Sequence, residues 1–207
     1  AIQNKLKFAA PATKTGKKIA VIGGGPAGLS AAYQLARMGH DVTIFDEHEF
    51  LGGMMRYGIP GFRTPRDVLD AEIQRILDLG IEVRLKCRVG TDVKLEQLRE
   101  DFDAVFLGLG AQGGRALPCD GNDAPNVVTA TSFLRAFNDG RPLPMGRRVV
   151  VIGAGNVAYD VARSAVRPAW YKSEVEEAEE VDHGQQMAYD AARSALRLSG
   201  DKEAHIV

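Results

Sequence analysis

A glycine turn between an apolar run and an amphipathic segment constrains the fold of this chain more than any other feature. Residues 19–22 are the β-branched run IAVI, and GGGPAG at 23–28 follows directly. Apolar residues then recur at helical spacing up to Met38, and DVTIFD at 41–46 indicates a second buried strand. A strand, a glycine turn, a helix and a parallel strand together predict a dinucleotide-binding unit.

Each residue of this turn has its own expected role. Gly23 lets the strand end tightly, Gly25 lets the backbone approach a pyrophosphate, and Gly28 lets helix and strand pack closely. Pro26 and Ala27 begin the helix, whose free N–H groups and positive dipole favour phosphate. The alternative is that the three glycines serve only the turn.

Asp46 ends the second strand, where a carboxylate can accept hydrogen bonds from both hydroxyls of a ribose. The alternative for Asp46 is a solvated acid at a strand end. Glu47 is a second candidate contact, although a residue beside the ligand is more often a bystander.

The rest of the chain continues the alternation of strands and helices. Thr64-Pro65 starts an apolar stripe at helical spacing that ends before Gly80, and a strand, a short helix and another strand follow it. The stripe consists of Val68, Leu69, Ile73, Ile76 and Leu77. This order predicts an α/β fold with parallel sheets.

A second glycine turn follows the apolar run VVVI at 149–152. Gly153 and Gly155 take the first and third positions of GAGNVA, Asn156 and Val157 lie where the helix begins, and Ala158 replaces the last glycine. Alanine is still small enough for close packing. Two such turns predict two dinucleotides, one bound by each unit.

Composition excludes several classes of function. Twenty-six basic and twenty-seven acidic residues give a formal charge of -1, so we expect neither nucleic acid nor a membrane surface as a partner. The two cysteines and four histidines have no metal-ligand spacing, and we expect the histidines to be surface or capping residues. No metal site is expected in this chain, and a cytoplasmic setting fits best.

Longer stretches resemble a known family. IAVIGGGPAGLSAAYQLARMGHDVTIFD, GGMMRYGIPGFRTPRDVLDAEIQRILDLGIEV, DAVFLGLGA and VVVIGAGNVAYDVAR are similar to the small, flavoprotein subunit of NADPH-dependent glutamate synthase and its relatives. The resemblance implies the two-dinucleotide-binding-domain flavoprotein fold, in which an NAD(P)H domain interrupts an FAD domain. It implies FAD at the first glycine turn and the nicotinamide nucleotide at the second.

The resemblance also implies FAD contacts outside the first turn. The positions concerned are Gly53, Met54, Arg63, Val89 and Gly110. Other interpretations are a core side chain for Met54, a surface charge for Arg63 and an ordinary buried strand residue for Val89.

We expect three parts along the chain. Residues 1–17 are a lead-in, 18–145 the amino-terminal part of the FAD-binding domain, and 146–207 the start of the NAD(P)H-binding domain. Because the chain begins with Ala and stops on AHIV, we expect a piece of a longer protein, truncated at its carboxyl end.

The sequence of the helix predicted after the second turn occurs twice in the chain. AYDVARSAVR begins at residue 158 and AYDAARSALR at residue 188, with an acidic spacer between them. We interpret this as an insertion near 168–187 that projects as a helical hairpin. The alternative is a flexible acidic loop.

By the resemblance, this is an oxidoreductase subunit that transfers hydride from NADPH or NADH to FAD, with electrons passing onward to iron–sulfur clusters in a partner domain or larger subunit. Hydride transfer to a flavin requires no side-chain acid or base, so no catalytic residue is predicted. Two alternatives are a ferredoxin:NADP oxidoreductase subunit of the same fold and a non-catalytic nucleotide-binding or assembly module.

Overall fold

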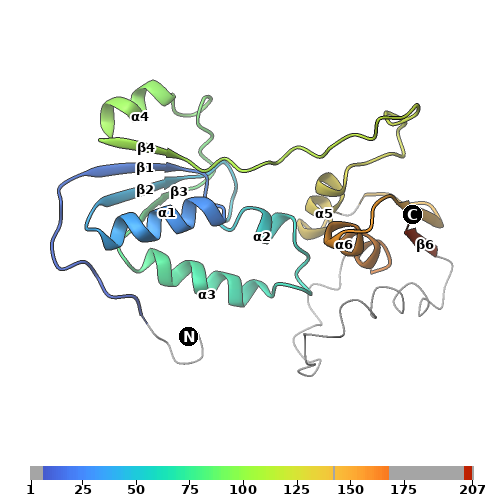
Figure 1. Cartoon of the computed structure of the whole chain (residues 1–207), viewed down its shortest axis with the longest axis horizontal. Helices are drawn as coiled ribbons and strands as arrows, with labels where there is room; N and C mark the ends of the chain where they lie inside the picture. Colours follow the sequence, from blue (N-terminus) through green and yellow to red (C-terminus); the bar gives the residue numbers. More distant parts are fainter. Residues whose placement is uncertain (1–6, 142, 168–202, 207) are drawn as a thin grey trace. The chain divides into compact units, whose positions relative to one another are not determined.

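The computed structural model describes residues 7–141, 143–167 and 203–206. The chain divides into two compact units (Figure 1). The first unit comprises Ala1–Arg56 and Thr64–Ala111, and the second comprises Tyr57–Arg63 and Gln112–Val207. Residues 112–145 therefore belong to the same compact unit as the second glycine turn, whereas we assigned them from sequence to the FAD-binding part.

The first unit is built on a parallel sheet, as predicted. Its strands lie in the order β3-β2-β1-β4, and all pairs are parallel. They are β1 (Lys18–Ile22), β2 (Asp41–Phe45), β3 (Glu82–Arg84) and β4 (Ala104–Leu107). The predicted α/β class is confirmed. From β1 the chain builds outward through β2 to β3 and then crosses to β4 on the other side of β1.

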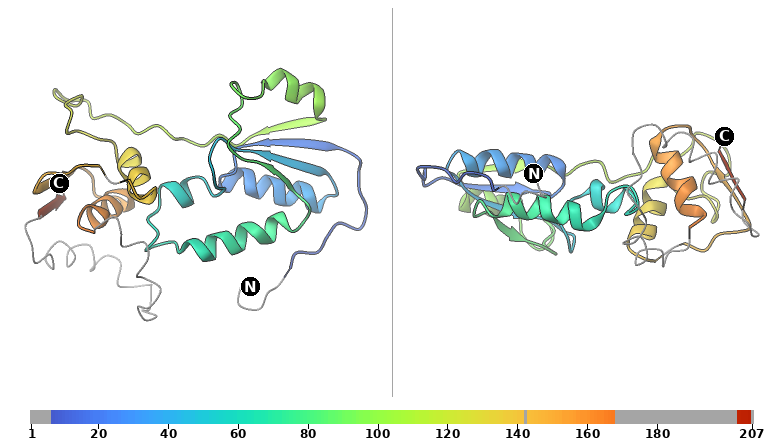
Figure 2. Two further views of the ribbon diagram at one scale, coloured as in Figure 1. Left: turned by 180° about the vertical axis from the view of Figure 1, so that it is seen from behind. Right: turned by 90° about the horizontal axis from the view of Figure 1, so that it is seen from below.

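Three helices cover the two faces of this sheet. Figure 1 shows α1 (Pro26–Arg37) and α3 (Arg66–Leu77) on one face and α4 (Leu95–Asp101) on the other. A short helix, α2 (Met54–Tyr57), lies between β2 and α3 in the sequence. Seen from behind in Figure 2, the carboxyl ends of β1, β2 and β4 converge beside the start of α1.

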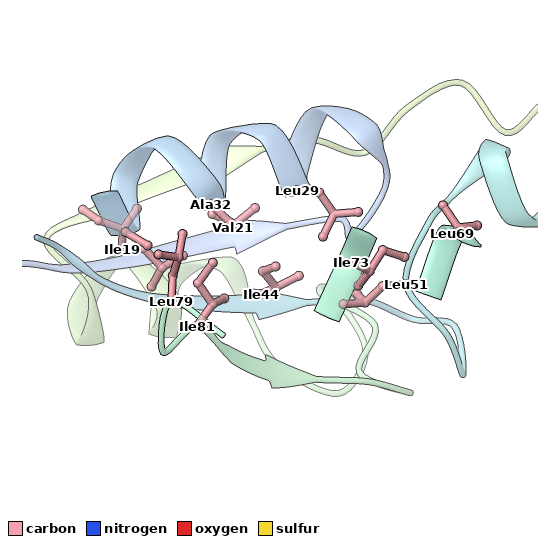
Figure 3. Packing of buried hydrophobic residues seen from close by; sticks show 12 residues of the cluster. Ile19, Val21, Leu29, Ala32, Ile44, Leu51, Leu69, Ile73, Leu79 and Ile81 are labelled. Atoms are coloured by element: carbon pink, nitrogen blue, oxygen red, sulfur yellow. The ribbon is translucent and has the colours of Figure 1, made fainter. Parts of the chain in front are cut away.

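The core of the first unit follows from the alternation of side chains along β1. Ile19 and Val21 face α1 and α3, where Val21 packs with Leu29 of α1 and Ile73 of α3 (Figure 3). Ala20 and Ile22 belong instead to a cluster with Leu98 of α4. Because successive strand residues point to opposite faces, the apolar run of residues 19–22 in β1 requires helices on both sides.

The second unit contains a smaller parallel pair, β5 (Arg148–Val151) and β6 (Glu203–Ile206), in which Val149 lies opposite Ala204. Part of the run AHIV thus forms a strand. Helices α5 (Ala130–Asn138) and α6 (Asn156–Ala165) share an apolar cluster with Val151 of β5. The spacer and the second copy of the repeated helix lie outside the described residues.

Two details differ from the sequence predictions. Val68, which the periodicity assigned to the apolar stripe of α3, is 44% exposed, whereas Leu69 and Ile73 are buried. Ile76 and Leu77 are partly buried against the same cluster, so the stripe differs from the prediction at Val68. Helix α5 was not predicted, although Thr129 caps it by accepting a hydrogen bond from the Ser132 N–H.

Candidate nucleotide-binding site

Of the three glycines to which we assigned roles in the first turn, Gly23 and Gly28 are required by the packing of the protein itself. Gly23 has a φ of +100°, and a Cβ there would lie 2.3 Å from the Gly108 carbonyl oxygen after β4. A Cβ on Gly28 would lie 1.7 Å from the Gly23 carbonyl oxygen. Both contacts are with backbone that cannot move aside, so β1, β4 and α1 meet at this distance only because these residues are glycines.

Gly25 has no such internal reason to be glycine. Its φ is -79°, which any residue adopts, and a Cβ there would meet only the Gly53 Cα, at 3.6 Å. Gly25 is the N-cap of α1 without a side-chain cap, and Pro26 and Ala27 in the first turn are exposed. N–H groups in a first helical turn have no acceptor within the helix. The turn therefore offers open space and backbone donors that fit a phosphate.

The segment after β2 closes against this turn. The Gly52 N–H donates to the Gly24 carbonyl oxygen at 2.8 Å. Gly53, with a φ of +51°, approaches so closely that a Cβ there would lie 2.7 Å from the Gly25 Cα. Met54 follows as the first residue of α2. The structure thus brings the predicted contact Gly53 to the glycine turn, with Met54 directly behind it in the chain.

Asp46 is tied to the turn more closely than the sequence suggested. It is 7% exposed, and its Oδ2 accepts the Gly24 N–H at 2.6 Å. Its Oδ1 accepts the backbone N–H of His48 at 2.8 Å and lies 2.8 Å from His48 Nδ1. A carboxylate has about four acceptor positions, so these three contacts leave about one, on Oδ2, for a ligand hydroxyl.

His48 corrects an expectation from sequence. We expected a surface or capping histidine, but its side chain is only 8% exposed and lies against Asp46. The sequence predicts this contact only weakly, because the two residues flank a turn at the end of a strand and their spacing does not determine how that turn folds.

The other predicted contacts of the first unit occupy varied surroundings. The Glu47 side chain is 41% exposed and lies 3.4 Å from Arg88 Nε. Val89 forms an isolated bridge with Val93 and packs beside the cluster under α4. Gly110, beyond β4, has a left-handed φ of +69°.

Two arginines lie near the segment that follows Gly53. Arg56 donates from Nε to the Leu51 carbonyl oxygen at 2.6 Å and pairs with Asp70. Arg66 donates to the Met55 carbonyl oxygen at 3.0 Å. Burial lowers the pKa of Arg66, and the neighbouring charge of Arg56 lowers it further, while Asp70 acts in the opposite direction. Arg56, Arg66 and Asp70 thus act on one another electrostatically beside this segment.

Arg63 lies in the second unit, where it pairs with a residue that the sequence analysis missed. Its Nη1 donates to both carboxylate oxygens of Asp160 in α6, at 2.8 and 2.7 Å. Asp160 is 4% exposed, and Arg63 is mostly buried. The surface-charge interpretation of Arg63 is therefore wrong. The available signal was an aspartate that lies in the predicted helix between the apolar pairs Val157-Ala158 and Val161-Ala162.

The second turn repeats the form of the first. Gly153 has a φ of +127°, and a Cβ there would lie 3.7 Å from the Ala158 Cβ, an ordinary contact. Ala158 therefore packs where the first turn needs a glycine. Gly155 is the N-cap residue of α6, and no side chain caps the helix there. A Cβ built on Gly155 would have nothing within 4 Å. Asn156 and Val157 are the first two residues of the helix, and both are exposed.

The described residues hold neither a metal-binding cluster nor a membrane-spanning helix. No three side chains among His, Cys, Asp and Glu lie close enough together there to hold a metal ion. None of the described helices is both long enough and apolar enough to span a lipid bilayer.

Comparison with known proteins places this geometry in a family. The family described as "Pyridine nucleotide-disulphide oxidoreductase" matches residues 17–195. The chain is 48% identical over 159 residues to NADP(+)-dependent formate dehydrogenase subunit beta of Moorella thermoacetica, covering 75% of this chain and 22% of that protein. It is 40% identical over 165 residues to glutamate synthase [NADPH] small chain of Escherichia coli, covering 74% of this chain and 35% of that one.

A solved structure is similar in fold as well as sequence. Mycobacterium tuberculosis FprA in complex with NADPH is 28% identical and has a TM-score of 0.65, over 72% of this chain and 36% of FprA. The chain thus spans well under half the length of each of these proteins.

Proposed function

Because the chain belongs to the pyridine nucleotide-disulphide oxidoreductase family, we propose that it forms the nucleotide-binding part of an oxidoreductase subunit in which NAD(P)H reduces FAD. The observation that carries this proposal is the open space at Gly25. Backbone contacts require glycine at positions 23 and 28. A Cβ built on Gly25, by contrast, would meet nothing closer than 3.6 Å. A residue kept small without an internal cause is expected where a ligand approaches the backbone.

FAD binds at the first turn in this proposal. The pyrophosphate lies at the start of α1, over Gly25, Pro26 and Ala27, where the helix dipole and free N–H groups stabilise it. Asp46 accepts one hydrogen bond from the adenosine ribose through the position left on Oδ2. Gly53 and Met54 lie at the edge of the same site. The contacts of Glu47, Val89 and Gly110 with the nucleotide remain predictions.

NAD(P)H binds at the second turn, over Gly153, Gly155, Asn156 and Val157. Three features support this position: the strand–turn–helix form, the uncapped start of α6 and the similarity to FprA, whose structure contains NADPH. We favour NADPH over NADH because the names of several relatives specify NADP or NADPH.

When bound, the flavin supplies the chemistry by accepting a hydride at N5 from the nicotinamide. The residues of this chain bind and orient the two nucleotides and hold them for the transfer, and no side chain of the site is needed to move a proton. The relatives are named as small or beta subunits of enzymes with different final substrates. We therefore propose that the shared step is flavin reduction, and that electrons pass on to iron–sulfur clusters in a larger partner subunit, in the cytoplasm.

The test uses the intact protein loaded with FAD and mixed anaerobically with NADPH in a stopped-flow spectrometer. We expect the flavin absorbance near 450 nm to bleach in a single rapid phase whose rate saturates with NADPH. Flavin that stays oxidised, although dithionite reduces it, would support the alternative of a nucleotide-binding or assembly module.

A further inference from the structure

The segment YGIPGFR at residues 57–63, called here the strap, belongs to the second compact unit. Its two ends continue covalently into the first unit, since Arg56 precedes it and Thr64 follows it. The strap therefore belongs by packing to the nucleotide unit that carries Gly153–Gly155, and by connectivity to the flavin unit that carries Gly53.

Helix α5 holds the amino-terminal half of the strap. The Asn138 side chain donates from Nδ2 to the carbonyl oxygens of Tyr57, at 3.0 Å, and Ile59, at 3.3 Å. The Arg135 guanidinium lies over the Tyr57 ring, 5.5 Å from its centroid. These contacts fix backbone as well as side chain, because one amide group satisfies two strap carbonyls.

Helix α6 holds the carboxyl-terminal half. Arg163 and Arg167 lie over the Phe62 ring at 5.0 and 4.3 Å from its centroid. The ring of Phe62 also packs edge-on against Phe137, at 6.4 Å. Arg63 then pairs with Asp160, which is 4% exposed. A buried carboxylate without a partner is costly, so Asp160 requires Arg63 to be in place.

We propose that the Arg63–Asp160 pair positions the nicotinamide-nucleotide helix α6 for hydride transfer by anchoring the strap to it. α6 begins at the second glycine turn, so a shift of α6 moves the nucleotide bound there. The strap leaves α2 only four residues after Gly53, which packs on the flavin turn. The inference rests on the proposed function and deepens it, because Arg63 and Asp160 act as positioning residues rather than as direct contacts of the reacting atoms.

The strap proposal differs from the expectation that Arg63 touches FAD. If Arg63 serves FAD directly, removing Asp160 should leave flavin reduction intact and removing Arg63 should weaken FAD binding. If the pair positions α6, both substitutions should have the same effect, on the rate of transfer rather than on flavin content. The double variant should then be no slower than either single one.

The experiment compares the intact wild-type protein with Asp160→Asn, Arg63→Gln and the double variant. Asn138→Leu is a second probe that removes hydrogen bonds to the strap without changing charge. Asp41→Asn is the control, since Asp41 is an exposed residue of the first unit that pairs with Lys14 and contacts none of the strap partners named above. Stopped-flow reduction by NADPH gives the limiting rate and the apparent NADPH Kd. Hydrogen exchange of residues 57–63 reports on the strap whether or not flavin is reduced.

We expect both single variants and the double variant to retain FAD, to keep an NADPH Kd within about twofold and to transfer hydride about tenfold more slowly. This is a change of about 1.4 kcal/mol in the barrier. Strap amides should exchange faster in all three, Asn138→Leu should change in the same direction, and the control should match the wild type.

Several results would overturn the inference. These are a wild-type rate in Asp160→Asn, a loss confined to NADPH affinity, strap exchange that does not change, or loss of flavin in Arg63→Gln alone. A wild-type protein that binds no flavin would defeat the proposed function instead, and the exchange measurement would still decide whether the pair anchors the strap.

Discussion

Substituting Gly25 and Gly28 separately by alanine should distinguish ligand binding from packing within a single turn. In Gly25→Ala the new Cβ meets only the Gly53 Cα, at 3.6 Å, and the φ of -79° suits alanine. Alanine is a poorer N-cap than glycine, but it also restricts the unfolded chain. These effects oppose each other, so the free energy of unfolding of the apoprotein should change by no more than about 1 kcal/mol.

The same methyl group should nevertheless impair FAD binding, because it occupies the space through which a pyrophosphate reaches the backbone. Steric overpacking typically costs about 1–3 kcal/mol, which corresponds to roughly 5- to 150-fold weaker binding. Fluorescence titration of the apoprotein with FAD measures this affinity.

Gly28→Ala should instead destabilise the apoprotein. Its Cβ would lie 1.7 Å from the Gly23 carbonyl oxygen, and backbone cannot rotate away as a side chain can. We expect a loss of at least about 3 kcal/mol in urea unfolding of the apoprotein, the upper end of overpacking costs. The reasoning is refuted if Gly25→Ala binds FAD as tightly as the wild type, or if Gly28→Ala is as stable as the wild type.

Three further substitutions test separate parts of the account by urea unfolding. Asp46→Ala should lower stability by about 1–3 kcal/mol, because the buried Gly24 N–H loses its acceptor, and an unchanged apoprotein would contradict that contact. Leu98→Ala, at a side chain 1% exposed, should cost about 2–5 kcal/mol, whereas Leu95→Ala, at 36% exposed, should cost well under half as much; equal losses would contradict the packing of α4. The third substitution is Asp103→Asn. In the folded wild-type protein, the hydrogen bond from Lys17 lowers the pKa of Asp103 below its ordinary 3.8. The stability that this carboxylate adds is therefore present above pH 3.8 and is lost as pH falls through the lowered pKa. The free energies of unfolding of the wild type and the variant should therefore converge in acid. A difference between them that does not change with pH would contradict the pairing of Asp103 with Lys17.

The elements around the glycine turns could be predicted because local sequence determines them. The run IAVI is apolar at every position, which requires helices on both faces, and GGGPAG follows where only a strand-to-helix turn fits. The predicted family was confirmed by the family match over residues 17–195 and by the similarity to glutamate synthase small chain.

Other features depend on contacts between residues distant in sequence, which pattern alone does not determine. Asp160 and Arg63 are 97 residues apart, and nothing local marks them as partners. Residues 112–145 belong to the second unit because α5 packs on α6. The sequence did not predict α5, because Thr129 is its one clear boundary signal. His48 was misjudged because burial at a strand end depends on how the next loop folds.

The central claim is that backbone amides at the first glycine turn hold the pyrophosphate of FAD. The most direct test is an experimental structure of the intact protein with FAD bound. We expect phosphate oxygens within hydrogen-bonding distance of the backbone at the start of α1, with the adenosine ribose beside Asp46. A pyrophosphate bound elsewhere, with the space beside Gly25 filled by protein, would contradict the account.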